Sequence, residues 1–196
     1  MKQIELDNFL FKKNRAFLVL GLCFFPAFLM ISCNQVFVFK KNLTLNHTSF
    51  DVESRSGLKT DSLVVSLEAP GHEKFTLERQ IDRKIYAAEI ADLDANDVPE
   101  IYIFGKSNDE DEYGDVFSFT VDDSKGLMEI FVPTLDPYIS KGYMGHDKFS
   151  VSEKYLNREF MVSRDVKQSG IQKVKYEISK SAVGLYLNEL KSSSGK

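Results

Sequence analysis

The chain has 196 residues, of which only two are cysteines and none is tryptophan. Two cysteines are too few for a small protein held together by disulfides. Hydrophobic residues make up 43% of the chain and charged residues 28%. This balance excludes a disordered tail, a collagen and a polytopic membrane protein. The composition therefore predicts one ordinary globular domain.

Motifs for catalysis are also missing. The three histidines, His47, His72 and His146, are scattered, and no HExxH, GxSxG or glycine-rich phosphate loop occurs. Two carboxylates can hydrolyse a glycosidic bond, but nothing selects such a pair among the acids of this chain. We therefore expect a protein that is not an enzyme and that needs no organic cofactor. The formal net charge of −4 also argues against a nucleic-acid partner.

The longest hydrophobic run lies near the N-terminus. Residues 16–32 carry no charge and follow the basic residues Lys12, Lys13 and Arg15. A basic segment followed by an apolar segment is typical of a secretory signal. The residues that follow, LMISC at positions 29–33, resemble the bacterial lipoprotein signal, in which the cysteine is lipidated after cleavage.

We therefore predict a signal peptide over residues 1–32 and a lipid anchor on Cys33. The alternative is an uncleaved membrane anchor, for which the run is just long enough. Both interpretations place the protein on the bacterial cell envelope. Asn34 is not the aspartate that retains some lipoproteins in the inner membrane, which favours the outer membrane, facing the periplasm or the surface.

After the anchor, polar residues dominate the chain up to residue 61, which predicts a tether that leads into a first strand. From residue 62 the hydrophobic residues alternate with polar ones in short β-branched or aromatic runs. These runs cover residues 63–67, 75–77, 85–90, 101–104, 116–121, 128–132, 149–151, 160–162, 174–178 and 183–187. Their spacing leaves no room for crossover helices, apart from one short helix that residues 136–142 would allow.

The fold class that follows is all-β: an antiparallel β-sandwich of roughly eight strands over residues 62–190. Residues 33–61 would be the lipidated cysteine with the tether and first strand. Residues 191–196 are expected to be a polar tail.

One acidic turn between two predicted strands has the spacing of a calcium loop. Residues that can offer an oxygen ligand occupy alternate positions. They are Asp92, Asp94, Asn96, Val98 through its backbone carbonyl, and Glu100. The sixth position, where such a loop needs a sharp turn, is Asp97 instead of glycine. Asp and Asn also form ordinary turns. The spacing thus leaves two alternatives, a structural turn and a weak calcium site.

This turn also begins a resemblance to a known family. The segment ADLDANDVPEI at residues 91–101 resembles the DIDGDGxPEI motif of bacterial periplasmic inhibitors of invertebrate-type lysozyme. The likeness continues in the same order through YGDVFS, KGYMGHDKF, LNREF and QKVKY, at residues 113–118, 141–149, 156–160 and 172–176. The last three segments resemble stretches of lipoprotein members of that family.

The resemblance implies a non-catalytic β-sandwich that inserts one strand-connecting loop into the active cleft of a lysozyme-like hydrolase. By position, Ser107, Tyr113 and Gly114 match the residues of that loop. Between them, the glycines and serines of the family are replaced by acids, Asp109, Glu110, Asp111 and Glu112. Residues 107 and 109–114 are therefore the predicted partner-binding residues.

Acidic residues are dense around both motifs. From Glu89 to Asp115 the sequence has ten acids and a single base, Lys106. This density predicts an acidic end of the domain that attracts a cationic partner. The alternative is a solvated hairpin that keeps a sheet edge soluble. A second function also remains open, namely a calcium-stabilised β module with a structural or adhesive role on the envelope.

The anchor gives the first testable prediction. Replacing Cys33 by alanine should abolish metabolic labelling of the protein with a fatty acid, because the cysteine thiol is the predicted acceptor. Mass spectrometry should show that the mature protein starts at residue 33. Continued labelling of Cys33→Ala, or a mature wild-type protein that still begins at residue 1, would contradict the lipoprotein assignment.

Overall fold

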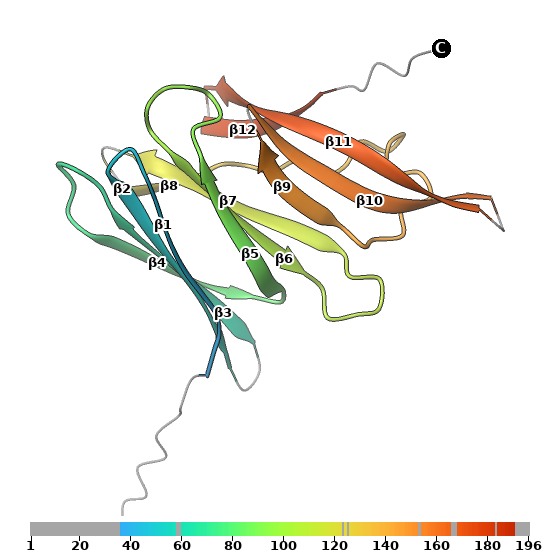
Figure 1. Cartoon of the computed structure of the whole chain (residues 1–196), viewed down its shortest axis with the longest axis horizontal. Helices are drawn as coiled ribbons and strands as arrows, with labels where there is room; N and C mark the ends of the chain where they lie inside the picture. The colour runs from blue at the N-terminus through green and yellow to red at the C-terminus, as the bar shows by residue number, and fades with distance from the viewer. Residues whose placement is uncertain are drawn as a thin grey trace, which may run out of the picture. The chain divides into compact units, whose positions relative to one another are not determined.

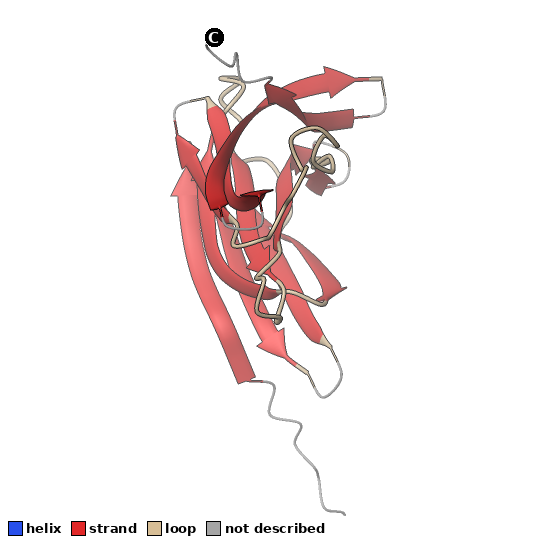
Figure 2. Cartoon of the chain, turned by 90° about the vertical axis from the view of Figure 1, so that its right-hand side faces the viewer, coloured by secondary structure: helices blue, strands red, loops and turns tan. Residues whose placement is uncertain are grey.

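The computed structural model describes residues 36–57, 60–122, 124, 126–152, 154–165, 168–182 and 184–190. Every regular element among them is a β-strand, as Figure 2 shows. The strands are β1 (Val36–Leu45), β2 (Thr48–Ser56), β3 (Asp61–Glu68), β4 (Phe75–Ile81), β5 (Lys84–Ala91), β6 (Glu100–Lys106), β7 (Gly114–Asp122), β8 (Gly126–Glu129), β9 (Lys148–Ser152), β10 (Tyr155–Asp165), β11 (Gln168–Ser181) and β12 (Gly184–Leu190).

These strands form three antiparallel sheets of four strands each (Figure 1). The first sheet has the order β1-β2-β3-β4, the middle sheet β5-β6-β7-β8, and the third sheet β12-β11-β10-β9. Within each sheet, strands that pair are consecutive in the sequence. The predicted all-β antiparallel class is confirmed. The described residues contain twelve strands instead of roughly eight; the ten alternating runs overlap β3 to β12, and β1 and β2 lie before the first run.

The middle sheet is buried on both faces, and strand β6 shows why. Successive side chains of a strand point to opposite faces. Ile101 and Ile103 therefore pack into a core with residues of β2 and β3, whereas Tyr102 and Phe104 pack into a second core with residues of β10 and β11. All four side chains are fully buried. One strand thus contributes to both hydrophobic cores.

Residues 36–56 do not form the tether that the sequence suggested. They form strands β1 and β2, which pair in register and turn at Asn46 and His47, both with positive φ. In β2 the buried positions alternate regularly and include Thr48 and Ser54 beside Phe50 and Val52. The small polar side chains at buried positions made this strand look like a tether in the sequence.

The connection between β8 and β9 contains no helix. Within residues 136–142, the backbone amides of Ile139 and Ser140 both donate to the carbonyl oxygen of Asp136, which gives a single turn. Further along, Tyr143 forms an isolated antiparallel bridge with Val162 of β10. The segment that follows lies against the β6–β7 loop and is part of the candidate site.

Candidate functional site

The turn between β5 and β6 is folded by its own polar side chains. Both carboxylate oxygens of Asp92 accept hydrogen bonds, from the backbone amides of Asn96 (3.0 Å) and Asp97 (2.9 Å). The side-chain oxygen of Asn96 accepts the amide hydrogen of Val98 at 2.7 Å. Such bonds from Asp and Asn to nearby backbone amides stabilise tight turns. These bonds hold the turn from within, and the side-chain nitrogen of Asn46, in the β1–β2 turn, adds a bond to the Asp97 carbonyl oxygen at 3.3 Å.

Two residues of the turn have left-handed backbone conformations, Ala95 with φ of 54° and Asp97 with φ of 66°. Both residues occupy positions at which the DIDGDGxPEI motif has glycine. The absence of glycine at the sixth position therefore does not prevent the sharp turn, because aspartate tolerates this conformation better than most residues. The backbone adopts the shape that the motif requires.

Glu100 begins strand β6 and is fully buried. Its Oε2 atom accepts hydrogen bonds from the backbone amide of Leu93 (2.8 Å) and from the hydroxyl of Tyr102 (3.4 Å). Its Oε1 atom is also buried but has no hydrogen-bond partner. An unsatisfied buried oxygen costs about 1–3 kcal/mol. Burial raises the pKa of Glu100 from an ordinary 4.5 to about 8.

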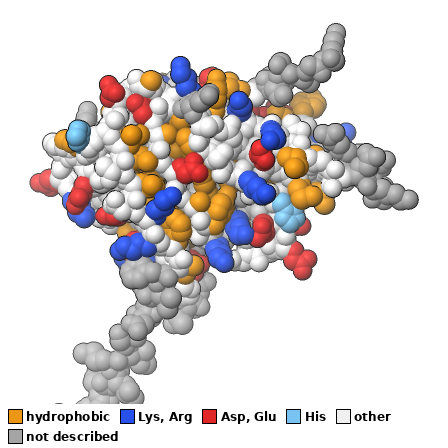
Figure 3. Space-filling view, in the orientation of Figure 1, with side chains coloured by type: hydrophobic (Ala, Val, Ile, Leu, Met, Phe, Trp, Pro, Cys, Tyr) orange, Lys and Arg blue, Asp and Glu red, His pale blue; other side chains and the backbone are white. Residues whose placement is uncertain are grey.

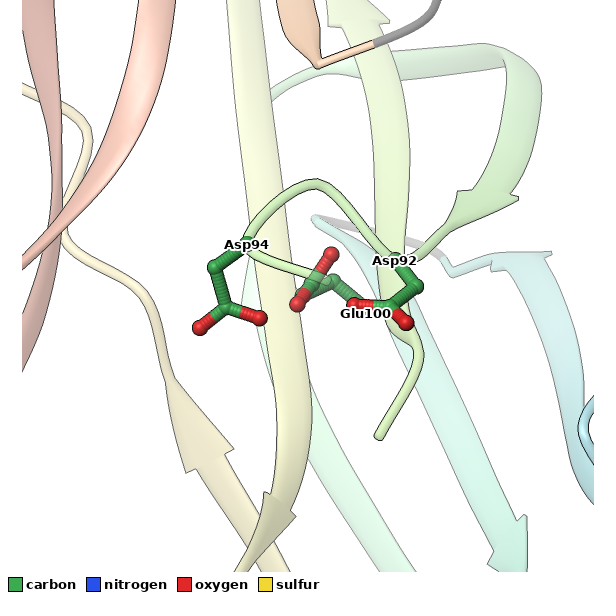
Figure 4. A group of neighbouring side chains, drawn as sticks. All are labelled: Asp92, Asp94 and Glu100. Atoms are coloured by element: carbon green, nitrogen blue, oxygen red, sulfur yellow. The ribbon is translucent and has the colours of Figure 1, made fainter. Parts of the chain in front are cut away.

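Three carboxylates meet at this turn (Figure 4), where the carboxylate of Glu100 lies between those of Asp92 and Asp94. One oxygen from each lies within 4.8 Å of the others. Among the described residues, this is the only group of three or more His, Cys, Asp or Glu side chains that could share a metal ion. None of the three histidines belongs to it.

The other two predicted ligands are the Asn96 side chain and the Val98 backbone carbonyl. The Asn96 oxygen accepts the amide hydrogen of Val98, and the Asn96 side-chain nitrogen donates to Asp94 Oδ2 at 3.0 Å. Asn96 thus braces the turn. Burial, together with the nearby charge of Asp92, raises the pKa of Asp94.

The loop at the other end of β6, residues 107–113, is closed by its own hydrogen bonds. The amide of Ser107 donates to the carbonyl of Tyr113 at 2.9 Å. The Ser107 hydroxyl donates to Asp109 Oδ1 (2.6 Å) and accepts the amide hydrogen of Tyr113 (2.8 Å). The Tyr113 hydroxyl donates to Asp111 Oδ2 at 2.9 Å. Glu112 forms an ion pair with Lys106.

A second segment holds this loop from the side. The amide of His146 donates to the carbonyl of Asp111 at 2.6 Å. This close approach requires a glycine at position 145, because its φ is 72° and a Cβ there would overlap with the Asp111 carbonyl oxygen. The amide of Gly114 donates to Asp147 Oδ2 at 2.8 Å. A Cβ on Gly114 would overlap with the Asp147 side chain.

Asp147 belongs to a buried cluster that the sequence analysis missed. Its Oδ1 atom accepts a hydrogen bond from Nε of Arg158 at 2.6 Å, and its Oδ2 atom accepts one from the hydroxyl of Tyr143. The Arg158 guanidinium lies over the rings of Tyr143, Phe149 and Phe160, 5.3–5.5 Å from their centroids. Its members lie in the two segments at residues 141–149 and 156–160 that the resemblance includes, but their contacts with one another are tertiary and leave no local pattern.

The predicted partner-binding residues therefore divide into two groups. Asp109, Glu110 and Asp111 are exposed. Ser107, Glu112, Tyr113 and Gly114 are partly buried, and each makes a bond within the loop or to its support. The Tyr113 ring also packs against Tyr143, with ring centroids 5.4 Å apart.

The acidic residues do not form the single acidic end that the sequence suggested. The turn with Asp92 precedes β6 and the loop with Asp109 follows it, so the two groups lie at opposite ends of the strand. A strand of this length spans roughly 20 Å. At the loop end, Lys84 pairs in register with Lys106. Figure 3 shows acidic and basic side chains interspersed on one face of the molecule.

No family model matches the chain, and no curated protein matches it. Within the part of the chain that the structure describes, no helix is long and apolar enough to cross a membrane. The predicted signal peptide and Cys33 lie outside the described residues.

The buried carboxyl gives a pH prediction for the protein kept free of divalent cations. Because the pKa of Glu100 is raised in the folded state, folding favours the protonated form. This contribution to stability is fully present below about pH 4.5 and is lost as the pH rises through about 8. The variant Glu100→Gln cannot ionise and should lack this loss. Urea unfolding in the presence of a chelator, at several pH values, measures the free energy of unfolding of both proteins.

The difference in free energy of unfolding between Glu100→Gln and wild type should therefore grow in favour of the variant from about pH 5 to 8. Parallel pH profiles for the two proteins would show that Glu100 titrates normally in the folded state.

Proposed function

We propose that the protein is a non-catalytic binding module of the cell envelope that recognises a protein partner through the β6–β7 loop, residues 107–114. The candidate partner is a lysozyme-like hydrolase, which the module would inhibit. One observation carries the proposal: the loop is clamped from the side by residues 145–147 while its acidic tip stays exposed. A hairpin that only reverses the chain needs no such support.

A rigid loop favours binding for a physical reason. Ordering a flexible loop on association lowers the affinity, and a loop that is already ordered avoids this cost. Binding residues placed on a rigid scaffold also keep their geometry. In this loop the Ser107 hydroxyl, the Asp111 carbonyl and the Gly114 amide are all held by hydrogen bonds. The loop would therefore meet its partner in one preformed shape.

The chemistry of the loop supports a partner with a basic surface. The hydroxyls of Ser107 and Tyr113, which the resemblance assigns to contacts with the enzyme, are engaged within the loop. Their acceptors, Asp109 and Asp111, use one carboxylate oxygen each for these bonds and remain exposed at the tip together with Glu110. Exposed carboxylates steer a cationic protein and bind its Arg and Lys side chains. Lysozymes are often basic, which suits this role.

The lipid anchor on Cys33 completes the proposal. A lipidated residue just before β1 would hold the three sheets at a membrane surface and concentrate them where cell-wall hydrolases act. The support for this part is the basic and apolar N-terminal sequence.

The alternative, a cation-stabilised structural or adhesive module, is favoured by a different observation. Glu100 is fully buried and one of its carboxylate oxygens has no hydrogen-bond partner. A bound cation and a partner-binding loop are compatible, because they would occupy opposite ends of β6.

The binding test uses the full chain and an invertebrate-type lysozyme. Glu110 is exposed at the loop tip, so Glu110→Lys should weaken binding about tenfold and slow association most at low salt. The matched control is Glu78→Lys, an exposed glutamate on β4 of the first sheet, which should bind as wild type does. Surface plasmon resonance and a muramidase assay measure both effects.

Tyr113→Ala removes the ring that packs on Tyr143 and should cost about 2 kcal/mol of binding. Its melting temperature must be measured alongside, because the ring also supports the loop. The proposal fails if the full chain neither binds nor inhibits any lysozyme, or if Glu110→Lys and Glu78→Lys weaken binding equally.

A further inference from the structure

We propose that the turn between β5 and β6 binds one divalent cation of the calcium type, with carboxylate oxygens of Asp92, Asp94 and Glu100 as ligands. This site goes beyond the proposed partner-binding function, since it lies at the other end of β6. Asp92 follows directly after β5, Asp94 lies in the turn, and Glu100 is the first residue of β6 (Figure 4). A bound ion would therefore link the turn to the first residue of β6.

The spacing of the oxygens suits a calcium ion. Calcium binds oxygen ligands at about 2.4 Å, so two ligands on opposite sides of the ion lie about 4.8 Å apart. The ligand atoms of the three carboxylates all lie within 4.8 Å of one another. They can therefore share one calcium ion with little movement. Magnesium binds at about 2.1 Å and would require the carboxylates to draw closer together.

The buried Glu100 oxygen points to a ligand independently of the acidic cluster. The side chain has no exposed surface, and Oε1 has no hydrogen-bond partner, although Oε2 accepts two hydrogen bonds. Buried polar atoms nearly always have a partner. Oε1 belongs to a carboxylate that lies between those of Asp92 and Asp94. A cation held by the three carboxylates would give this atom its missing partner.

The site is also accessible to an ion from solvent. Asp94 is exposed and Asp92 is partly exposed, while Glu100 forms the buried side of the group. Calcium takes six to eight oxygen ligands, and water molecules can supply those that the carboxylates do not. The three carboxylates together offer more negative charge than a single divalent cation neutralises, which favours retention of the ion.

The first experiment measures thermal unfolding of the full chain in detergent, after treatment with a chelator, with and without calcium chloride. At a calcium concentration 100 times the dissociation constant, the melting temperature should rise by about 5–10 °C. Glu100→Gln and Asp94→Asn should both lose this rise. The control Asp97→Asn removes an acid from the same turn that is outside the carboxylate group, and it should keep the rise.

The second experiment detects the ion itself through terbium, which replaces calcium and emits when a nearby aromatic ring is excited. The chain has no tryptophan, so tyrosine must transfer the energy. The hydroxyl of Tyr102 lies 3.4 Å from Glu100 Oε2, which makes its ring the natural donor. Tyr102→Phe should lose most of the terbium emission and keep the calcium-induced rise in melting temperature. Tyr138→Phe, which alters a tyrosine that is 91% exposed, should keep both.

Two results would overturn the proposal. The first is a wild-type melting temperature that calcium does not change, which would mean that the three carboxylates form only a turn. The second is a calcium effect that Glu100→Gln and Asp94→Asn retain in full, which would place the ion elsewhere. Neither result would affect the partner-binding proposal, because the Glu110→Lys test measures binding through a different loop.

Discussion

The burial of strand β6 on both faces is the constraint on which the rest of this structure depends. Its alternating side chains must satisfy two cores at once, with Ile101 and Ile103 on one side and Tyr102 and Phe104 on the other. The middle sheet therefore needs a cover on each face, and the first and third sheets supply it. The chain must then leave the buried layer within one or two residues of each end of the strand. At one end this places the carboxylate of Glu100 at the edge of the second core.

The two candidate sites follow from this arrangement. Where β6 begins, a turn built by Asp92 gathers three carboxylates around a buried oxygen that lacks a partner. Where β6 ends, the loop is closed by its own hydrogen bonds and is joined to Asp147 through the Gly114 amide. Asp147 in turn forms an ion pair with Arg158. Removing one partner of such a buried ion pair would leave the other charge buried and uncompensated. The middle strand thus separates the two candidate sites, the carboxylate group proposed for a cation and the loop proposed for a protein partner.

Much of this fold could be predicted from the sequence, because period-two runs such as residues 116–121 are a local signal. The third sheet was not predicted, although the unbroken apolar run at residues 101–104 is what a strand buried on both faces requires. Strand β2 was missed because Thr48 and Ser54 occupy buried positions. At the acidic turn, the spacing correctly brought Asp92, Asp94 and Glu100 together but could not show that Asn96 braces the turn. The support of the loop by Asp147 and Arg158 depends on tertiary contacts that no local pattern encodes.

The most direct test of the central role of β6 is hydrogen exchange of the backbone amides under native conditions. Amides that exchange only through global unfolding mark the most stable part of a structure. The prediction from the burial of β6 is that the amides of Ile101–Phe104 exchange most slowly, with a free energy equal to that of global unfolding from denaturant titration. It would be contradicted if these amides exchanged at a lower free energy than those of β3 and β11, since the outer sheets would then persist without the middle strand.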